Sequence, residues 1–327
     1  MISATSRARL QGTARRAATV ALLAFTLPAT AFAQDCGNSG AGFDAWLSRL
    51  KSKAASQGIS QGAISSALAG VSYDPTVIRL DRGQKSFKLS FEQFYARRVG
   101  PALIRRGQSL MRTHAATLDR VQKRFGVPPE IIIAIWGLET NYGADTSGRF
   151  SIVRSLATLA YDCRRSPFFT GQLLDAIRIV QKGDMSPADM RGGWAGEIGQ
   201  TQFLPYDYNE SAVDFDGDGR RDLRGSIPDV LASSANLLRK HGWQPGQPWM
   251  QEVRVPRDMP WEEADIAIQH PRSQWAKWGV KMATGKAVKA DNFPASLLLP
   301  MGKDGPAFLV YENFTTAYLK WNESLVY

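Results

Sequence analysis

The chain has 327 residues, of which 44% are hydrophobic, and its Lys and Arg residues outnumber Asp and Glu by 40 to 30. This length and composition exclude a disordered polymer and allow the core of one large domain or of two closely packed ones. The formal net charge of +10 favours an anionic polymer as partner.

The first 33 residues have the three parts of a secretory signal peptide. The basic region contains Arg7, Arg9, Arg15 and Arg16. The apolar stretch runs from Ala17 to Leu27, and the small-residue cleavage site is Ala31-Phe32-Ala33. We expect export and a mature chain, residues 34–327, that begins near Gln34. An uncleaved anchor is the alternative, but the stretch is too short to span a bilayer and Pro28 beside it breaks helices. No later segment is apolar enough to cross a membrane.

Export narrows the choice of partner. The signal peptide holds four arginines and no acids, so the mature chain keeps about +6 of the formal +10 charge. Nucleic acid is not a polymer that an exported protein normally meets. The cell wall is such a polymer, with carboxylates on its lactyl and peptide groups. We therefore expect peptidoglycan and not nucleic acid as the partner. We also expect no stable membrane insertion and a monomeric protein.

Two cysteines, Cys36 and Cys163, are the only ones in the chain. In an oxidising compartment such a pair predicts one disulfide that ties the mature N-terminus to the body of the fold. A lipid anchor on Cys36 is the alternative. The preceding Ala33-Gln34-Asp35 lacks the small and apolar pair expected at a lipoprotein cleavage site.

The N-terminal part of the mature chain has helical patterns. Apolar residues fall at helical spacing from Phe43 to Leu50, and a second short helix is predicted from about Ser60. Amphipathic stretches cover 77–124, and Gly126 closes the last of their helices. The core contacts expected there are Leu103, Leu110, Leu118, Val121 and Phe125.

The next predicted helix has an unusual composition. Pro128-Pro129-Glu130 begins it, since proline fits the first turn and an acid there complements the helix dipole. Residues 131–138 are apolar on every face, which predicts a helix buried all round. Glu139 follows directly, and its desolvated carboxyl would have a raised pKa suited to donating a proton near neutral pH. A glutamate that caps a helix or pairs with an arginine is the alternative.

Beyond this helix, further helices are predicted at 156–160, 168–180 and 228–239. The Gly- and Asp-rich region 192–222 indicates loops with little regular structure. Near the C-terminus, 296–299 and 307–311 flank Gly302-Lys303-Asp304-Gly305, which predicts a β-hairpin.

Asp214, Asp216 and Asp218 have the spacing of a calcium loop, with a glycine at the sixth loop position. The twelfth position is Gly225 instead of glutamate, which excludes a complete EF-hand. Three clustered acids in a solvated Asx-turn are the alternative.

Several sequence blocks, in order, resemble the family of lytic murein transglycosylase B, glycoside hydrolase family 103. They cover nearly all of the mature chain. They are 136–143 (WGLETNYG), 156–162 (LATLAYD) with 164–166 (RRS), 194–205 (WAGEIGQTQFLP), 212–219 (AVDFDGDG), Ala235-Asn236, His241-Gly242-Trp243 and Trp321-Asn322. The resemblance implies a mainly α (α+β) fold with a lysozyme-like core at about 125–245, a helical N-terminal part and an EF-like loop. It also implies a periplasmic enzyme that acts on peptidoglycan glycan strands.

The resemblance also implies a reaction. Glu139 would protonate the bond between N-acetylmuramic acid and N-acetylglucosamine and then take the proton of the muramyl C6 hydroxyl, closing a 1,6-anhydro ring without water. An ordinary glycosidase uses two carboxylates, and Glu197, in a Gly-rich loop, is the candidate for a second one; a solvated or loop-pinning glutamate is the expectation there. The alternatives are a hydrolytic muramidase that uses the same glutamate and a non-catalytic peptidoglycan-binding protein.

Further site residues are expected from the same resemblance. Gln202 would line the groove and bind an N-acetyl group, and Arg164 and Arg165 would meet carboxylates of the substrate or else form a solvated basic face. Tyr142 and Tyr327 would offer aromatic surface to sugars, with buried packing as the alternative. A carbonyl of Arg220 and a ligand near Asp222 would complete a structural calcium site; the chemistry itself needs no cofactor.

The chain departs from the family pattern at three places directly beside these blocks. Gly193 stands where a serine is usual, Tyr206-Asp207 where a serine pair is usual, and Leu237 where a tyrosine is common. Each change can alter a sugar contact.

Overall fold

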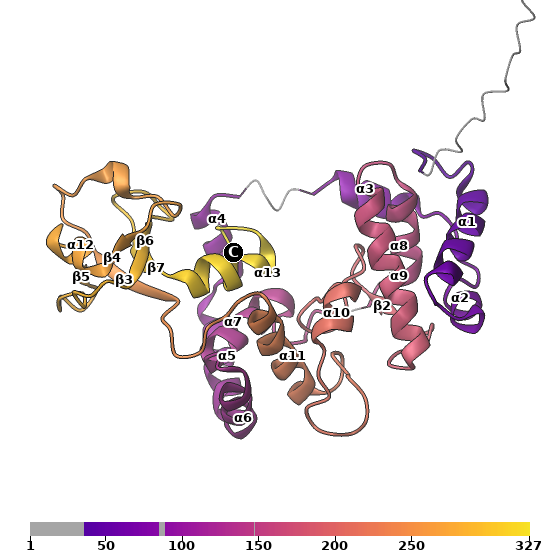
Figure 1. Ribbon diagram of the computed structural model, residues 1–327, viewed down its shortest axis with the longest axis horizontal. Coiled ribbons are helices and arrows are strands. Elements are labelled where there is room, and N and C mark those ends of the chain that lie inside the picture. Colours follow the sequence, from indigo (N-terminus) through magenta and orange to yellow (C-terminus); the bar gives the residue numbers. More distant parts are fainter. Residues whose placement is uncertain (1–35, 85–88, 147) are drawn as a thin grey trace, which may run out of the picture. The chain divides into compact units, whose positions relative to one another are not determined.

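Helices dominate the computed structural model, which describes residues 36–84, 89–146 and 148–327 (Figure 1). The predicted signal peptide lies outside these residues, and the described residues from Cys36 to Tyr327 belong to one unit. Among the described residues no helix is long and apolar enough to cross a bilayer.

The N-terminal part is helical, as predicted. It comprises α1 (Phe43–Ser56), α2 (Gln61–Ala67) and α3 (Pro75–Arg82). The apolar residues of α1 at helical spacing are buried. Ser60 caps α2, because its hydroxyl accepts a hydrogen bond from the backbone N–H of Ala63.

The region 77–124 forms separate helices. After α3 come α4 (Phe91–Arg98), α5 (Pro101–Thr113) and α6 (Ala115–Phe125), which ends at Gly126 with a positive φ of 71°. The core contacts predicted on α6 are buried, whereas Leu103 and Leu110 on α5 are only partly buried.

Helix α7 (Pro129–Thr140) carries the apolar run and begins at the predicted prolines. It is buried on nearly every face, but the prediction of complete burial is wrong at Ala134, which is exposed. Packing here is close: a Cβ on Gly137 would lie 2.8 Å from the ring of Tyr142. A larger residue at position 137 would therefore displace either the helix or the tyrosine.

The remaining helices include three that the sequence predicts and one that it does not. They are α8 (Ile152–Tyr161), α9 (Ser166–Lys182), α10 (Pro205–Ser211) and α11 (Ile227–Lys240). Helix α10 lies in the region predicted to be loops. It is short and polar, and it is fixed by burial of Tyr208 and by the side chain of Asn209, which donates to the carbonyl of Asp175 on α9.

Strands occur in two places. β1 (Phe150–Ser151) pairs with β2 (Arg191–Gly192), and a five-stranded sheet has the order β4-β6-β7-β3-β5. The predicted hairpin is confirmed as antiparallel β6 and β7. The other strands of the sheet were not predicted, and two of them are only two residues long. The strands of the sheet are β3 (Met250–Arg254), β4 (His270–Pro271), β5 (Lys281–Met282), β6 (Pro294–Leu298) and β7 (Ala307–Val310).

Short helical segments complete the C-terminal part. They are a 3-10 turn (Trp261–Glu263), α12 (Arg272–Lys277), a π-helical turn (Asn313–Tyr318) and α13 (Leu319–Asn322). Buried side chains form three clusters: one from the N-terminal helices with α8 and α9, one around α6, α7 and α11, and one on the sheet. Trp321 on α13 packs against the first two clusters and thus brings the C-terminal segment to the end of α7.

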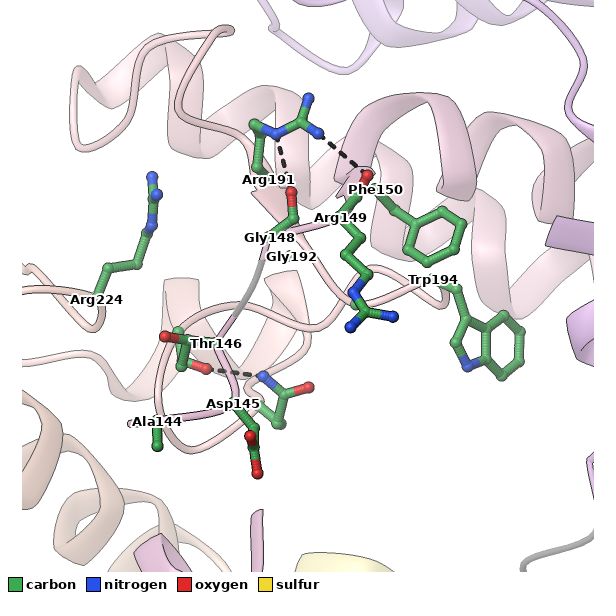
Figure 2. Close-up of a pocket in the computed structure, with 13 residues that line it drawn as sticks. Ala144, Asp145, Thr146, Gly148, Arg149, Phe150, Arg191, Gly192, Trp194 and Arg224 are labelled. Atoms are coloured by element: carbon green, nitrogen blue, oxygen red, sulfur yellow. Dashed lines mark hydrogen bonds between the residues drawn. The ribbon is translucent and has the colours of Figure 1, made fainter. Parts of the chain in front are cut away.

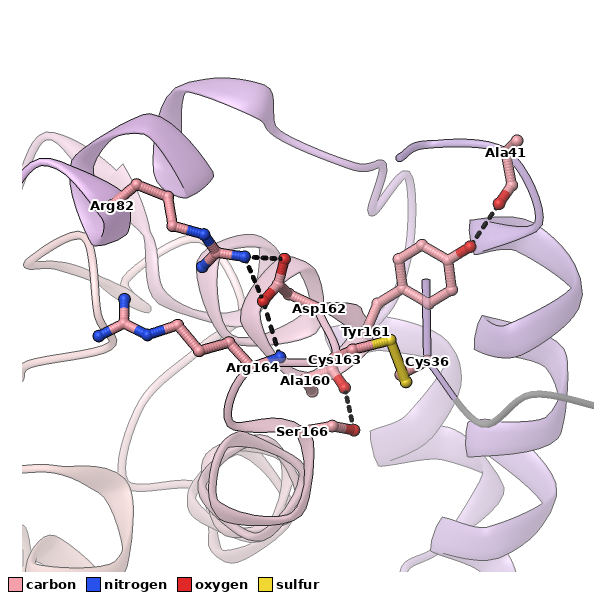
Figure 3. The surroundings of a disulfide bond; sticks show 9 residues. All are labelled: Cys36, Ala41, Arg82, Ala160, Tyr161, Asp162, Cys163, Arg164 and Ser166. Atoms are coloured by element: carbon pink, nitrogen blue, oxygen red, sulfur yellow. Dashed lines mark hydrogen bonds and ion pairs between the residues drawn. A yellow bond between two sulfur atoms is a disulfide. The ribbon is translucent and has the colours of Figure 1, made fainter. Parts of the chain in front are cut away.

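A disulfide joins Cys36 to Cys163, across 127 residues of sequence (Figure 3). The backbone N–H of Gly37 donates to the carbonyl of Tyr161, so two links hold the N-terminal segment at the end of α8. Next to it, both carboxylate oxygens of Asp162 accept 2.8 Å hydrogen bonds from Arg82.

Loss of this disulfide should destabilise the protein. A cross-link that closes a long loop restricts the unfolded chain, and we expect the Cys36→Ser/Cys163→Ser variant to lose about 2–5 kcal/mol of unfolding free energy. Urea denaturation measures this loss, and only the wild type should respond to reductant. Labelling of both thiols in the non-reduced, denatured wild type would contradict the bond.

Candidate active site

Glu139 lies in the last turn of α7 and faces a cavity of about 760 Å³. The cavity is lined by residues of α7, α9, α10 and α11. It is also lined by the Gly-rich loop after β2 (residues 193–204) and by the C-terminal segment (residues 319–327). Besides Glu139, the charged residues and the histidine that line the cavity are Arg165, Glu197, Asp207, His241, Lys320 and Glu323; Trp194, Gln202 and Trp321 line it as well.

Both hydrogen bonds to the Glu139 carboxyl reach the same oxygen. The indole N–H of Trp321 donates to Oε1 at 2.8 Å, and the hydroxyl of Tyr327 donates to Oε1 at 2.9 Å. Among the described residues Oε2 accepts no hydrogen bond, and it is not a fully buried atom. A proton on Glu139 therefore belongs on Oε2, which is open to the cavity.

The pKa of Glu139 is raised from its ordinary value of 4.5, because burial disfavours the charged carboxylate. The donors Trp321 and Tyr327 and the charge of Arg98 act against this shift, whereas the charge of Glu197 adds to it. Burial prevails, as the apolar run before Glu139 predicts.

Glu197 is not solvated, and its position agrees with the loop-pinning role that was expected as the other possibility. It is mostly buried, lines the cavity of Glu139, and accepts a 2.9 Å hydrogen bond from the N–H of Ala195 through Oε2. A Cβ on Gly193 would lie 2.1 Å from that oxygen, so the glycine in place of the usual serine makes room for the carboxyl. Burial raises the pKa of Glu197.

A third carboxyl, Asp207 on α10, lines the same cavity. Burial raises its pKa to about 6. The sequence offered Glu197 as the candidate for a second carboxylate, and folding brings Asp207 and Glu323 to the same cavity as well. The hydrogen bonds from Trp321 and Tyr327 distinguish Glu139 from these carboxyls.

Gln202 lies where the Gly-rich loop turns, with a positive φ of 55°. Its amide N–H donates to the carbonyl of Gly199 at 2.8 Å, which fixes the side chain and leaves its Oε1 free to accept a hydrogen bond. Gln202 lines the cavity of Glu139, where the sequence places it.

The two arginines predicted to meet substrate differ in position. Arg164 donates to the buried carboxylate of Asp81 at 2.6 Å and does not line the cavity. Arg165 also pairs with Asp81, lies over the ring of Phe169, and does line the cavity. The geometry thus leaves only Arg165 within reach of a ligand beside Glu139.

The two tyrosines predicted to offer surface to sugars do not line the cavity. Tyr142 is 7% exposed, and its hydroxyl donates to the carbonyl of Leu103, which is the buried packing held as the alternative. Tyr327 contacts Glu139 instead. The contacts of Trp321 and Tyr327 with Glu139 could not be predicted from local spacing, because these residues lie more than 180 positions away from Glu139.

The acidic loop brings together a set of residues that differs from the predicted one. Carboxylate oxygens of Asp214, Asp216 and Asp229 lie within 4.8 Å of one another. Asp218 and Asp222 are outside this group, and their Oδ1 atoms accept backbone hydrogen bonds within the loop. Asp229 lies on α11 and was not predicted. Three converging carboxylates suit a hard divalent cation such as calcium.

The chain matches the family model described as the transglycosylase SLT domain over residues 42–327. It belongs to this family. A curated relative, membrane-bound lytic murein transglycosylase B of Escherichia coli K12, is 35% identical over 149 residues, which are 45% of this chain and 41% of that protein. The match therefore spans less than half the length of that relative.

Two solved structures extend the likeness. SltB3 from Pseudomonas aeruginosa, in complex with NAG-anhNAM-pentapeptide, has a TM-score of 0.82 and 42% identity over 89% of this chain and 77% of its own. Escherichia coli Slt35 in complex with calcium has a TM-score of 0.71 and 26% identity over 86% of this chain and 88% of its own. The resemblance to the lytic murein transglycosylase B family and the predicted lysozyme-like α+β fold are confirmed.

The raised pKa of Glu139 predicts a pH-dependent stability difference between the wild type and Glu139→Gln. The folded protein holds the proton to a higher pH than the unfolded chain, so the free energy of unfolding falls as pH rises from about 4.5 through the folded-state pKa. Glutamine is neutral and keeps the oxygen that Trp321 and Tyr327 contact. We expect equal stability near pH 4 and a more stable variant at pH 8, measured by urea denaturation; a variant less stable than wild type at pH 8 would contradict the burial of Glu139.

Proposed function

We propose that the protein is a peptidoglycan lytic transglycosylase that cleaves the β-1,4 bond between N-acetylmuramic acid and N-acetylglucosamine without water. The observation that carries the proposal is the carboxyl of Glu139, buried at the end of an apolar helix, held through Oε1 and open through Oε2 to a cavity of about 760 Å³. Family membership and the likeness to SltB3 support it.

Protonated Glu139 begins the reaction. Its Oε2 gives the proton to the glycosidic oxygen, and the bond from that oxygen to muramyl C1 breaks. The oxygen of the muramyl acetamido group bonds to C1 and takes over the positive charge that develops there. The substrate thereby replaces the second carboxylate of an ordinary glycosidase.

Glu139, now a carboxylate, completes the reaction. It takes the proton of the muramyl C6 hydroxyl while O6 attacks C1 and displaces the acetamido oxygen, so a 1,6-anhydro ring closes and the carboxyl is protonated again. Trp321 and Tyr327 stabilise the carboxylate between the two steps, because both donate to Oε1. Burial favours the protonated form needed at the start.

Glu197 has a supporting role in this mechanism. Its Oε2 is held by Ala195, and no hydrogen bond from another described residue is seen at its Oε1, which is not a fully buried atom. We propose that Oε1 accepts a hydrogen bond from the N–H of the muramyl acetamido group. This group gains positive charge when its oxygen bonds to C1. The free amide oxygen of Gln202 is a second acceptor in the same cavity.

The central variant is Glu139→Gln, which keeps the shape of the side chain and removes proton transfer. We predict that it folds, still sediments with purified peptidoglycan, and loses lytic activity by at least about a thousandfold, the upper part of the range for general acid and base catalysis. Turbidity loss of peptidoglycan suspensions measures the activity.

Glu197→Gln and Asp207→Asn are the matched controls, since both replace a carboxyl of the same cavity with its amide. Both should retain far more activity than Glu139→Gln, with a loss below about a hundredfold. If either control loses as much as Glu139→Gln, two carboxylates share the proton transfers and the single-glutamate mechanism fails.

We propose the periplasm as the compartment and peptidoglycan glycan strands as the partner. The signal-peptide pattern of residues 1–33, the disulfide between Cys36 and Cys163, and the positive charge of the mature chain support this assignment. The disulfide engages Cys36 through the sulfur that a lipid anchor would need.

We further propose that Asp214, Asp216 and Asp229 hold a calcium ion with a structural role. The ion would link the loop before Asp222 to α11, since Asp229 also accepts backbone hydrogen bonds from Phe215 and Asp222. The calcium complex of Slt35 supports the choice of metal. The reaction described above takes no step through this site.

Calcium should therefore stabilise the protein. A ligand that binds only the folded state raises the melting temperature, and we predict a rise of several degrees when calcium is added to metal-stripped wild type. Asp216→Asn should remove most of this response, whereas Asp119→Asn, an exposed acid on α6, should keep it. Equal responses of the two variants in differential scanning calorimetry would exclude this site.

A further inference from the structure

A second cavity, of about 480 Å³, adjoins the one that contains Glu139 (Figure 2). It is formed by the loop that follows α7, by the β1–β2 pair and by the Gly-rich loop. Trp194 and Gln202 line both cavities, so a ligand that crosses these two side chains occupies both. Apart from Gln202, no residue with a role in the proposed reaction lines this second cavity.

Its lining is basic. Arg149, Arg191 and Arg224 contribute three positive charges, and Asp145 is the one acidic residue among the lining residues. Among the described residues, neither Arg149 nor Arg191 forms an ion pair with a carboxylate. Arg224 comes no closer than 3.9 Å to a carboxylate oxygen of Asp189, which is well exposed. The cavity therefore keeps a net positive charge to offer a ligand.

The three arginines are not equivalent. Arg191 donates to the backbone carbonyls of Gly148 and Arg149, as Figure 2 shows, and so holds the loop in place. Arg224 donates to the backbone carbonyl of Asp189. Arg149 has no hydrogen bond from its side chain to a described residue and is exposed, so its guanidinium is free to pair with a ligand carboxylate through two hydrogen bonds.

We propose that this basic cavity binds a carboxylate of the peptide carried by the muramyl residue, with Arg149 as the main contact and Arg224 as the second. The inference rests on the proposed function. A glycan strand is uncharged apart from its muramyl substituents, whereas each peptide carries several carboxylates. A sugar held beside Glu139 and Gln202 would place its peptide at the neighbouring cavity. Of the two arginines that the sequence suggested as carboxylate contacts, Arg164 is held by Asp81 away from the cavity of Glu139, whereas Arg149 lines the second cavity without such a pair.

The test compares two substrates: peptide-bearing glycan strands, and the same strands after an amidase has removed the peptides and the lactyl carboxylates exposed by this cut have been converted to amides. For Arg149→Gln we expect KM on peptide-bearing strands to rise about tenfold, and further in Arg149→Gln/Arg224→Gln, with kcat unchanged. KM on peptide-free strands should not change. Arg149→Lys, which keeps the charge, should retain part of the affinity, and Arg257→Gln, an exposed arginine near the sheet, should behave as wild type.

The other outcomes overturn the proposal. An equal rise of KM on both substrates would show that Arg149 positions the loop without reading the peptide. An unchanged KM on both would show that the cavity binds no part of the substrate. Failure of the proposed function is distinct, because wild-type protein would then release nothing from either substrate.

Discussion

The burial of one carboxyl group governs the arrangement around it. Glu139 follows an apolar run that removes it from water, which raises its pKa, while Trp321 and Tyr327 supply hydrogen bonds that its anion needs. Burial thus favours the protonated acid, while the two donors stabilise the anion that remains after the proton has left. They also depend on the C-terminal segment, since both donors come from the last residues of the chain.

The Gly-rich loop forms another part of the site around Glu139, and two hydrogen bonds fix it to α7. The indole N–H of Trp136 donates to the side chain of Gln200, and the hydroxyl of Thr140 donates to its backbone carbonyl. Thr140 is the residue after Glu139, so the loop that carries Glu197 and Gln202 is held next to the carboxyl. The glycine at 193 belongs to the same arrangement, because any side chain there would meet the Glu197 carboxyl.

Local sequence predicts the parts of this protein that local forces determine. The apolar run before Glu139, the helix end at Gly126 and the hairpin partners β6 and β7 all follow from patterns a few residues long. The features that the sequence did not predict depend on packing between segments that are far apart in the chain. Helix α10 has a polar sequence without periodicity, Asp229 joins Asp214 only because α11 packs beside the loop, and the burial of Glu197 depends on how the Gly-rich loop folds back.

The chemistry attributed to Glu139 differs from hydrolysis in its product. Mass spectrometry of muropeptides released by the wild-type protein from purified peptidoglycan tests this difference directly. We expect 1,6-anhydro-N-acetylmuramic acid ends, which weigh one water less than hydrolysed ends and are not reduced by borohydride. Reducible ends as the main product would show that water reaches C1, and the protein would then be a muramidase that uses the same glutamate.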